Sequence, residues 1–177
     1  MVKVRNIQRG AAVLVLAGAA TAISLTATAA SPTTTPRASV PSCRNGQLVN
    51  WLDTASNGAA GTTYYWLQFT NVSSHRCELY GYPGVSAVNR SGRQIGAAAE
   101  RNASSVRTVM LAAGETARAS LGIVVTANFP PSTCRSVTAD GLRVYAPNLT
   151  ASDVIPFPFP TCSRKADVSL SIGAVTH

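Results

Sequence analysis

Few residues of this chain could support catalysis. A nucleophilic triad requires a general base within hydrogen-bond reach of a serine, threonine or cysteine, and His75 is the only histidine inside the chain. It belongs to the polar segment 71–77, which has the composition of a solvated loop. The seven acidic residues are widely spaced, and no glycine-rich phosphate loop is present. The sequence therefore predicts a protein that is not an enzyme, with no catalytic residue and no cofactor.

The four cysteines are the residues best suited to covalent chemistry. They are Cys43, Cys77, Cys134 and Cys162, and all of them follow the predicted leader. An even number of cysteines outside the cytosol is typical of disulfides, whereas the absence of a C-x-x-C pair argues against zinc and predicts no metal site. Three pairings are possible. We favour Cys43 with Cys77 and Cys134 with Cys162, which would close two moderate loops, each contributing about 3 to 4 kcal/mol.

Aromatic residues provide the first candidate binding surface. Residues 64–70 alternate in the manner of a half-buried strand. If one face of this strand meets the core, the inward residues are Tyr65, Leu67 and Phe69. Tyr64 and Trp66 then project from the opposite face, beside Arg118 if that residue points outward on its own strand. Such a Tyr/Trp pair is suited to contact a carbohydrate or a protein, unless a loop such as 155–160 folds over it.

The proline-aromatic segment 155–160 is a second candidate surface. Its alternating prolines remove backbone donors and favour an extended edge conformation, so Phe157 and Phe159 either pack on the core or project from it. Because Cys162 follows closely, an edge strand fixed to the core is one interpretation. A recognition surface is the other.

The remaining pattern predicts strands. Apolar and polar residues alternate repeatedly, and no stretch after the leader keeps a 3.6-residue period. The clearest strands lie at residues 64–70, 106–111, 116–125, 142–145 and 168–174, with a hairpin signal over 85–95 around an Asn89–Gly92 turn. We expect 106–111 and 116–125 to pair or neighbour one another, and Asp140-Gly141 to form a turn. Seven or eight short strands separated by turns predict an all-β sandwich.

The beginning of the chain has the layout of a signal peptide. Three basic residues precede an apolar run, and small residues near Ala29 suit cleavage. We assign residues 1–29 to the leader, 30–42 to a Thr/Pro-rich linker and 43–177 to one folded domain. Retention of the leader as a membrane anchor is the alternative, because the uncharged segment approaches the roughly 20 residues that cross a bilayer. The predicted localisation is secreted or extracellular, with the cell envelope as a variant.

The charge of the chain bears on its partners. The formal net charge is +8, of which the predicted leader carries three charges. The other basic residues are scattered singly, so they predict neither a nucleic-acid patch nor membrane insertion after cleavage. Their excess keeps a small domain soluble, and it also suits an anionic envelope polymer. A secreted protein is the other candidate partner.

An ordered set of motifs resembles a known family. Cys43 is followed by Leu67-Gln-Phe-Thr-Asn71, by Cys77-Glu-Leu-Tyr-Gly-Tyr-Pro-Gly-Val85, by Leu111-Ala-Ala-Gly-Glu-Thr-Ala117 and by Cys134 and Cys162. This set is similar to the family named domain of unknown function 4232, and the string from Cys77 to Val85 is its most specific part. The resemblance implies an immunoglobulin-like antiparallel β-sandwich of about seven or eight strands, found mainly in actinobacterial secreted proteins and lipoproteins. It supplies no catalytic residues.

These patterns predict a secreted, non-catalytic β-sandwich domain that acts as a binding or structural module at the cell envelope. One alternative is a cell-wall hydrolase, which would need His75 buried beside a carboxylate and a serine. Another is a secreted inhibitor that presents Phe157 and Phe159 on a rigid loop. The ligand and the oligomeric state are not specified by the sequence, because β-sandwiches host many unrelated functions on similar cores.

Overall fold

The structure is a computed structural model that describes residues 39–177. The predicted leader, residues 1–29, lies outside the described residues, and so does the part of the linker that precedes Ser39. Within the described part, no helix combines the length and the apolar character needed to span a membrane. The only helical elements there are two single turns, η1 (Thr126–Asn128) and α1 (Pro131–Cys134), so the domain is all-β.

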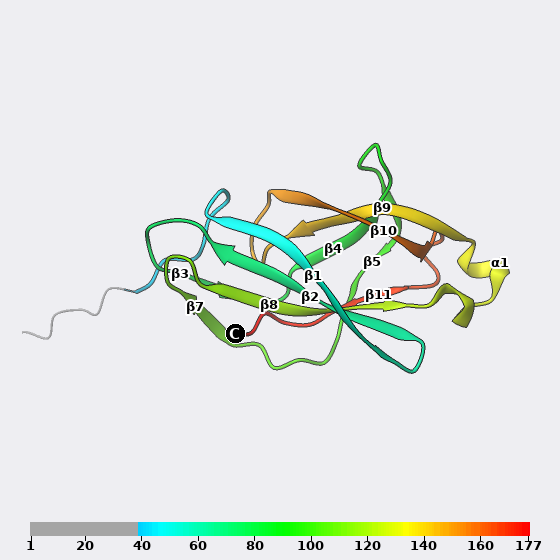
Figure 1. Ribbon diagram of the computed structural model, residues 1–177, viewed down its shortest axis with the longest axis horizontal. Coiled ribbons are helices and arrows are strands. Elements are labelled where there is room, and N and C mark those ends of the chain that lie inside the picture. Colours follow the sequence, from blue (N-terminus) through cyan, green and yellow to red (C-terminus); the bar gives the residue numbers. More distant parts are fainter. Residues whose placement is uncertain (1–38) are drawn as a thin grey trace, which may run out of the picture. The chain divides into compact units, whose positions relative to one another are not determined.

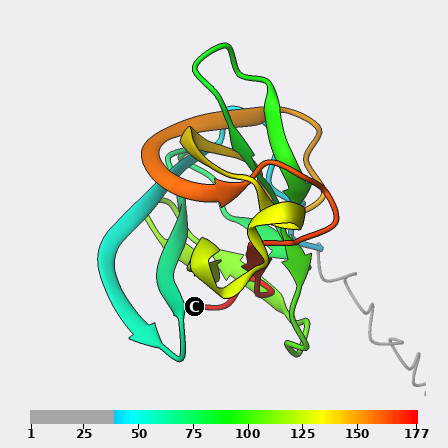
Figure 2. The same ribbon diagram turned by 90° about the vertical axis from the view of Figure 1, so that its right-hand side faces the viewer.

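The larger sheet contains five strands in the order β1-β2-β8-β11-β6 (Figure 1). Their bounds are Leu48–Ala59 for β1, Thr62–Asn71 for β2, Thr116–Val124 for β8, Leu170–Ile172 for β11 and Glu100–Arg101 for β6. The first four are antiparallel neighbours, whereas β6 runs parallel to β11. In this sheet β1 and β6 are the edge strands, and the turn between β1 and β2 projects from the body of the domain (Figure 2).

The second sheet has four antiparallel strands in the order β10-β9-β4-β5. Their bounds are Ser152–Cys162 for β10, Ser136–Tyr145 for β9, Gly84–Val88 for β4 and Gln94–Ala98 for β5. A separate two-stranded sheet pairs β3 (Cys77–Tyr80) with β7 (Thr108–Leu111). The hairpin predicted over residues 85–95 is confirmed as β4 and β5.

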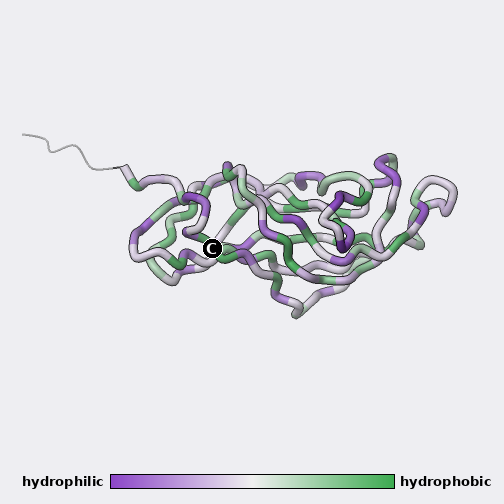
Figure 3. Tube along the Cα trace, turned by 90° about the horizontal axis from the view of Figure 1, so that it is seen from above, coloured by the Kyte–Doolittle hydropathy of each residue, from purple (hydrophilic) through white to green (hydrophobic). Residues whose placement is uncertain are grey.

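One hydrophobic core joins the two larger sheets. Leu67 and Leu121 enter it from the larger sheet, and Leu142 and Val144 enter it from the second sheet. Along β2 and β8, buried residues alternate with more exposed ones over much of each strand. Figure 3 colours the chain by hydropathy and shows hydrophobic and hydrophilic stretches following one another along it. Because these buried side chains form a single cluster, the inner faces of the two sheets pack against each other.

The strand β2 follows the predicted alternation. Leu67 and Phe69 are fully buried, and Tyr65 packs against the core with part of its ring exposed. Tyr64 and Trp66 lie on the opposite side of the strand, as the two-residue period requires. The inward and outward assignment of this strand is therefore confirmed.

The predicted pairing of residues 106–111 with 116–125 is wrong. The first segment contributes β7, which pairs with β3, while β8 pairs with β2 and β11. Between β7 and β8 the chain changes sheets, and the buried Asn71 side chain donates hydrogen bonds to the carbonyls of Leu111 (3.1 Å) and Ala112 (3.1 Å) at this crossing. The side-chain amide replaces the strand-to-strand bonds that a hairpin would have made.

The predicted turn at Asp140-Gly141 is also wrong, because both residues lie inside β9. Gly141 is directly opposite Pro156, and a Cβ atom at residue 141 would lie 2.5 Å from the Ile155 carbonyl oxygen. The register of β10 shifts between Pro156 and Phe159. The glycine therefore allows the backbones of β9 and β10 to approach closely where their pairing is irregular. It does not reverse the chain.

The structure contains more strands than the sequence predicted. The described residues contain eleven strands where seven or eight were expected, and the parallel pair of β6 and β11 departs from the expected antiparallel arrangement. The long edge strand β1 was not predicted, because most of its residues after Leu52 are exposed and give no regular apolar alternation.

Both favoured disulfide pairings are confirmed. Cys43 is bonded to Cys77 and Cys134 to Cys162, and all four residues are almost completely buried. The first bond ties the segment before β1 to β3, and the second ties α1 to the end of β10. No free cysteine remains. Two such bonds are consistent with a protein outside the reducing cytosol.

Candidate functional site

The outward side of β1, β2 and β8 carries two of the three exposed aromatic side chains of the described residues, Trp51 and Tyr64. We call this surface the aromatic face and define it by Trp51, Tyr64, Trp66 and Arg118. Both tryptophans of the chain lie on it. Trp51 is directly opposite Gln68, which is directly opposite Arg118, and Trp66 occupies the next outward position along β2. Directly opposite residues share one side of a sheet, so the strand register brings these four side chains together.

Trp51 is held in place by a chain of hydrogen bonds along the surface. Its indole Nε1–H donates to Thr70 Oγ1 at 3.0 Å, and Thr70 Oγ1 lies 2.9 Å from Thr116 Oγ1. The three residues come from β1, β2 and β8 in turn. The polar atom of the indole is therefore satisfied within the protein, while 41% of the residue stays exposed for contact with a partner.

Trp66 and Arg118 form a stacked pair. The guanidinium carbon of Arg118 lies 4.5 Å from the centroid of the Trp66 ring. Arg118 Nε donates to a main-chain oxygen of His177 at 3.2 Å, and the Arg118 backbone exchanges two hydrogen bonds of 2.8 Å with Thr176. The arginine is therefore fixed both at its backbone and at its head group. It covers the half-buried indole, which leaves Trp51 and Tyr64 as the more open rings.

Tyr64 lies over a glycine. It is directly opposite Gly122 of β8, and a Cβ atom at residue 122 would lie 3.1 Å from Tyr64 Cε1. The ring thus lies over the backbone of residue 122, in space that a side chain there would need. Tyr64 remains 38% exposed. An aromatic residue packed over a strand glycine in this way helps to fix the register of the two strands.

Apolar surface continues beyond these rings. Val49 is an outward residue of β1 and Val72 follows β2, and they are 49% and 56% exposed. Half of the eight large hydrophobic residues that are exposed in the described part lie on β1 and β2 or directly after β2, so exposed apolar surface is concentrated here. Arg118 is the only cation, and Asp53 the only acid, among the outward residues of the three strands.

Phe157 and Phe159 do not belong to this surface. Phe157 packs edge to face against Tyr65 with ring centroids 5.1 Å apart, and Phe159 is 5% exposed. The exposed positions of the segment are Pro156, Pro158 and Pro160. Because β10 is an edge strand, these prolines remove no ladder hydrogen bond that the sheet needs. The edge-strand interpretation of this segment is therefore confirmed, and the two phenylalanines lie on the core side.

Trp51 was not predicted from the sequence as part of the site. The alternation of Leu48, Asn50 and Leu52 with Val49 and Trp51 was a usable signal. It covers only a few residues before a bulge between Asp53 and Asn57 interrupts the register with β2. This signal could have assigned Trp51 to the outward side of a strand, but its place near Trp66 depends on the register of β1 with β2.

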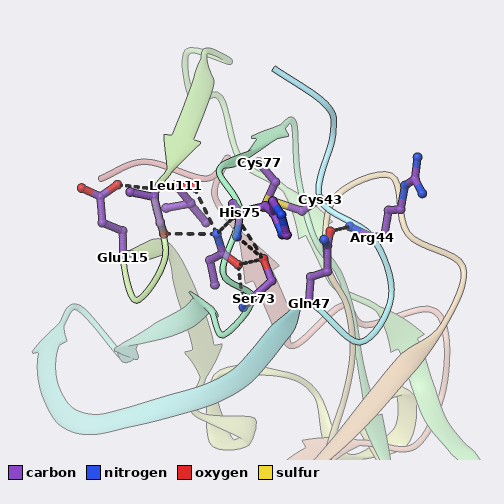
Figure 4. Close-up of a disulfide and its surroundings, with 10 residues drawn as sticks. Cys43, Arg44, Gln47, Ser73, His75, Cys77, Leu111 and Glu115 are labelled. Carbon is purple, nitrogen blue, oxygen red and sulfur yellow. Dashed lines mark hydrogen bonds between the residues drawn. A yellow bond between two sulfur atoms is a disulfide. The ribbon is translucent and has the colours of Figure 1, made fainter. Parts of the chain in front are cut away.

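His75 lies in the loop beside the first disulfide (Figure 4). Its side chain is exposed, and its Nδ1 atom lies 3.1 Å from Ser74 Oγ. Within residues 39–177 the only ion pair is Arg90 with Asp140, at 3.9 Å, so no carboxylate orients His75. No group of three His, Cys, Asp or Glu residues with metal-binding geometry occurs in this part of the chain.

Several clefts open on the described residues. One pocket of about 150 Å³ lies at the core side of β2 and β8, between Tyr65, Ile123 and Phe159. A larger one of about 430 Å³ lies next to the β4–β5 hairpin, beside Arg90 and Asp140. None of the residues that define the aromatic face lines either pocket. A third pocket, of about 410 Å³, borders the face, because Thr176 and His177, which contact Arg118, line it.

The stacked pair makes a spectroscopic prediction. In a Trp51→Phe background only Trp66 emits as an indole, and Arg118→Ala removes the group that covers it. We expect the emission maximum to shift to longer wavelength, with a loss of stability of about 0.5 to 1 kcal/mol from the lost cation–π contact. Arg93→Ala, an exposed arginine on the β4–β5 hairpin, should leave the spectrum unchanged. Identical spectra for all variants would contradict the stacking.

Comparison with known proteins places the chain in a family. None of the curated proteins and none of the solved structures matches it. A family model described as "Domain of unknown function (DUF4232)" matches residues 43–176, which include all four disulfide cysteines and the strands from β1 to β11. The match extends over well more than half of the chain. The chain therefore belongs to the DUF4232 family, as its motifs predicted.

Proposed function

We propose that this chain is a secreted, non-catalytic binding module whose partner docks on the aromatic face. The observation that carries the proposal is the concentration of exposed apolar and aromatic side chains on one side of one sheet. Exposed apolar patches of this kind are typical of interaction surfaces. Trp and Tyr contribute large contact areas at low cost in side-chain entropy, and Arg is enriched with them at interface centres.

We further propose that the two larger sheets constitute an immunoglobulin-like sandwich and that the leader exports the chain to the cell envelope or beyond. The shared core between the two sheets supports the first part. The two disulfides support the second, because they persist in oxidising compartments. In such a domain, rigid strands present the binding residues and the disulfides hold the loops.

The two alternatives have less support. A hydrolase centred on His75 would need a carboxylate to orient the imidazole, and the ring contacts only the Ser74 hydroxyl within the described residues. An inhibitor would need a presented loop, and Phe157 and Phe159 lie inside a paired strand with their rings on the core side.

A pull-down tests the proposal. The chain, expressed with its own leader and purified with both disulfides formed, is incubated with purified envelope polymers and secreted proteins of its host. We expect a partner to be retained and to be lost with Trp51→Ala and with Trp66→Ala, because each substitution removes a ring from the centre of the patch. Tyr80→Ala is the matched control, since Tyr80 is 53% exposed on β3, away from this face. A partner that all four proteins retain equally would contradict a role for the aromatic face.

A further inference from the structure

Two asparagine residues of the chain are followed directly by glycine, Asn45 and Asn57. Such a pair can react with itself, because the amide nitrogen of the glycine attacks the side-chain carbonyl carbon Cγ of the asparagine. Glycine has no Cβ atom that would hinder the approach. The reaction needs a glycine amide that is free of hydrogen bonds and an asparagine side chain that is free to turn toward it. The fold therefore decides which of the two pairs reacts.

The reaction has two steps and consumes only water. In the first step the bond between the glycine nitrogen and the asparagine Cγ forms while the bond between Cγ and Nδ2 breaks. The glycine amide proton passes to a solvent base, Nδ2 takes up a proton, and ammonia leaves. The product is a succinimide ring. In the second step one water molecule opens the ring at either of its carbonyl groups, which leaves aspartate or isoaspartate in place of asparagine.

Asn45 and Gly46 are the central residues of an exposed turn before β1. The Gln47 amide donates to the Arg44 carbonyl at 3.1 Å and closes the turn. The Arg44 amide in return donates to Gln47 Oε1 at 2.8 Å, beside the first disulfide (Figure 4). Gly46 has a φ of +82° and Asn45 has no positive φ, which is the pattern of a type II turn. The closing bonds therefore involve only the outer residues of the turn.

The reacting groups of this turn are free within the described part of the chain. Neither the Gly46 amide nor the Asn45 side chain makes a hydrogen bond there. A Cβ atom placed at residue 46 would have nothing within 4 Å, so the space beside the glycine is open. The turn thus meets both conditions of the reaction while the domain is folded.

Asn57 has a different environment, because it lies in a strand ladder. It is directly opposite Tyr64, and Gly58 is directly opposite Thr63, in the pairing of β1 with β2. Ring closure bends the backbone at the asparagine, and a paired strand resists this bend until the ladder opens locally. The second Asn-Gly pair should therefore be protected by the fold.

We propose that Asn45 is a site of spontaneous modification, which converts to aspartate and isoaspartate while the domain stays folded. The new carboxylate lies next to Arg44, and isoaspartate adds one methylene group to the main chain between Cys43 and β1. Asn45 also lines a pocket of about 90 Å³ together with Asp153, so the reaction gives that pocket a second acid. The modification is independent of the proposed function, since no residue that defines the aromatic face takes part in it.

Peptide mapping by mass spectrometry tests the proposal on the purified chain with both disulfides formed, incubated at mildly alkaline pH. The exchange of an amino group for a hydroxyl group changes the mass, and the change is followed over time at residues 45 and 57. In the same chain reduced and unfolded in guanidinium, we expect similar rates at the two sites. In the folded chain Asn45 should keep most of its rate, whereas the rate at Asn57 should fall at least about tenfold.

Two variants assign the signal. Asn45→Gln should abolish the change at residue 45, because the longer side chain would have to close a larger, less favourable ring. Asn57→Gln is the matched control and should leave the rate at residue 45 unchanged. Enzymatic methylation of isoaspartate gives a second readout of the same product. Equal slowing of both sites on folding, or faster reaction at Asn57 than at Asn45 in the folded chain, would overturn the proposal.

Discussion

Gly96→Ala is expected to destabilise the domain by about 3 to 5 kcal/mol, which is a large share of the stability of a single domain. Gly96 has a φ of +64°, and a Cβ atom there would overlap the carbonyl oxygen of Cys162. The left-handed conformation alone costs about 1 to 2 kcal/mol for alanine, and the overlap adds the cost of overpacking. Cys162 cannot move away freely, because it is bonded to Cys134 and, as the last residue of β10, is paired with β9.

The comparison variant for this prediction is Gly46→Ala. Gly46 also has a positive φ, +82°, but nothing lies within 4 Å of a Cβ atom placed there. It should lose only the conformational part, about 1 to 2 kcal/mol. Guanidinium unfolding of the oxidised proteins gives both free energies of unfolding. Equal losses for the two variants would show that the contact between β5 and the end of β10 is not rigid.

Local sequence patterns correctly predicted the inward and outward residues of strands that have one buried side. The alternation of residues 64–70 gave the correct inward and outward sides of β2, and that assignment placed Tyr64 and Trp66 on the candidate site. It succeeded because burial of one side imposes a two-residue period on the sequence. Arg118 could be added for the same reason, since its neighbours Ala117 and Ala119 are fully buried.

Pairing between strands could not be obtained in this way. The segment 112–115 has the appearance of a hairpin turn, and in the structure it is a crossing between two sheets. What allows the crossing is a side-chain amide from β2, about forty residues earlier in the sequence. Asp140-Gly141 failed for a related reason, because the glycine is required by the backbone of β10 and not by its own neighbours. Local turn chemistry is overridden where a distant segment supplies the contacts.

For the same reason, only part of the candidate site could be predicted from the sequence. Tyr64, Trp66 and Arg118 lie on strands with a regular period, whereas Trp51 lies on an edge strand that is mostly exposed. An edge strand that buries few side chains shows little apolar alternation in its sequence. Its contribution to the face becomes apparent only through its register with β2, and the hydrogen bond from Trp51 to Thr70 depends on that register.

Asn71 is the second residue whose loss should be costly, because it holds the crossing between β7 and β8. It is completely buried, and its Nδ2 amide donates to the carbonyls of His75 (2.8 Å), Leu111 (3.1 Å) and Ala112 (3.1 Å). Its Oδ1 atom accepts from the Ser73 amide at 3.0 Å and from the Ser73 hydroxyl at 2.7 Å. Asn71→Ala would leave several backbone groups without partners, and we expect a loss of about 3 to 5 kcal/mol.

Asn71→Asp separates the hydrogen bonds from the shape of the side chain. The carboxylate has nearly the same size but no donor, and it would face three carbonyl oxygens, so it should destabilise the domain at neutral pH at least as much as alanine does. Burial and these oxygens would raise the pKa of the new carboxyl in the folded state above its unfolded value. The folded variant then binds the proton more tightly, so its deficit relative to the unmodified chain should shrink as pH falls.

Asn128→Ala is the matched control for both substitutions at residue 71. The exposed Asn128 donates one side-chain hydrogen bond, to the Gly61 carbonyl at 3.1 Å, so its loss should cost no more than about 1 kcal/mol. Chemical unfolding at neutral and at acidic pH gives the required differences. Small, pH-independent losses at residue 71 would mean that the crossing between the sheets holds without this amide. A large loss at neutral pH that diminishes at acidic pH for Asn71→Asp would show that this amide holds the crossing from β7 to β8.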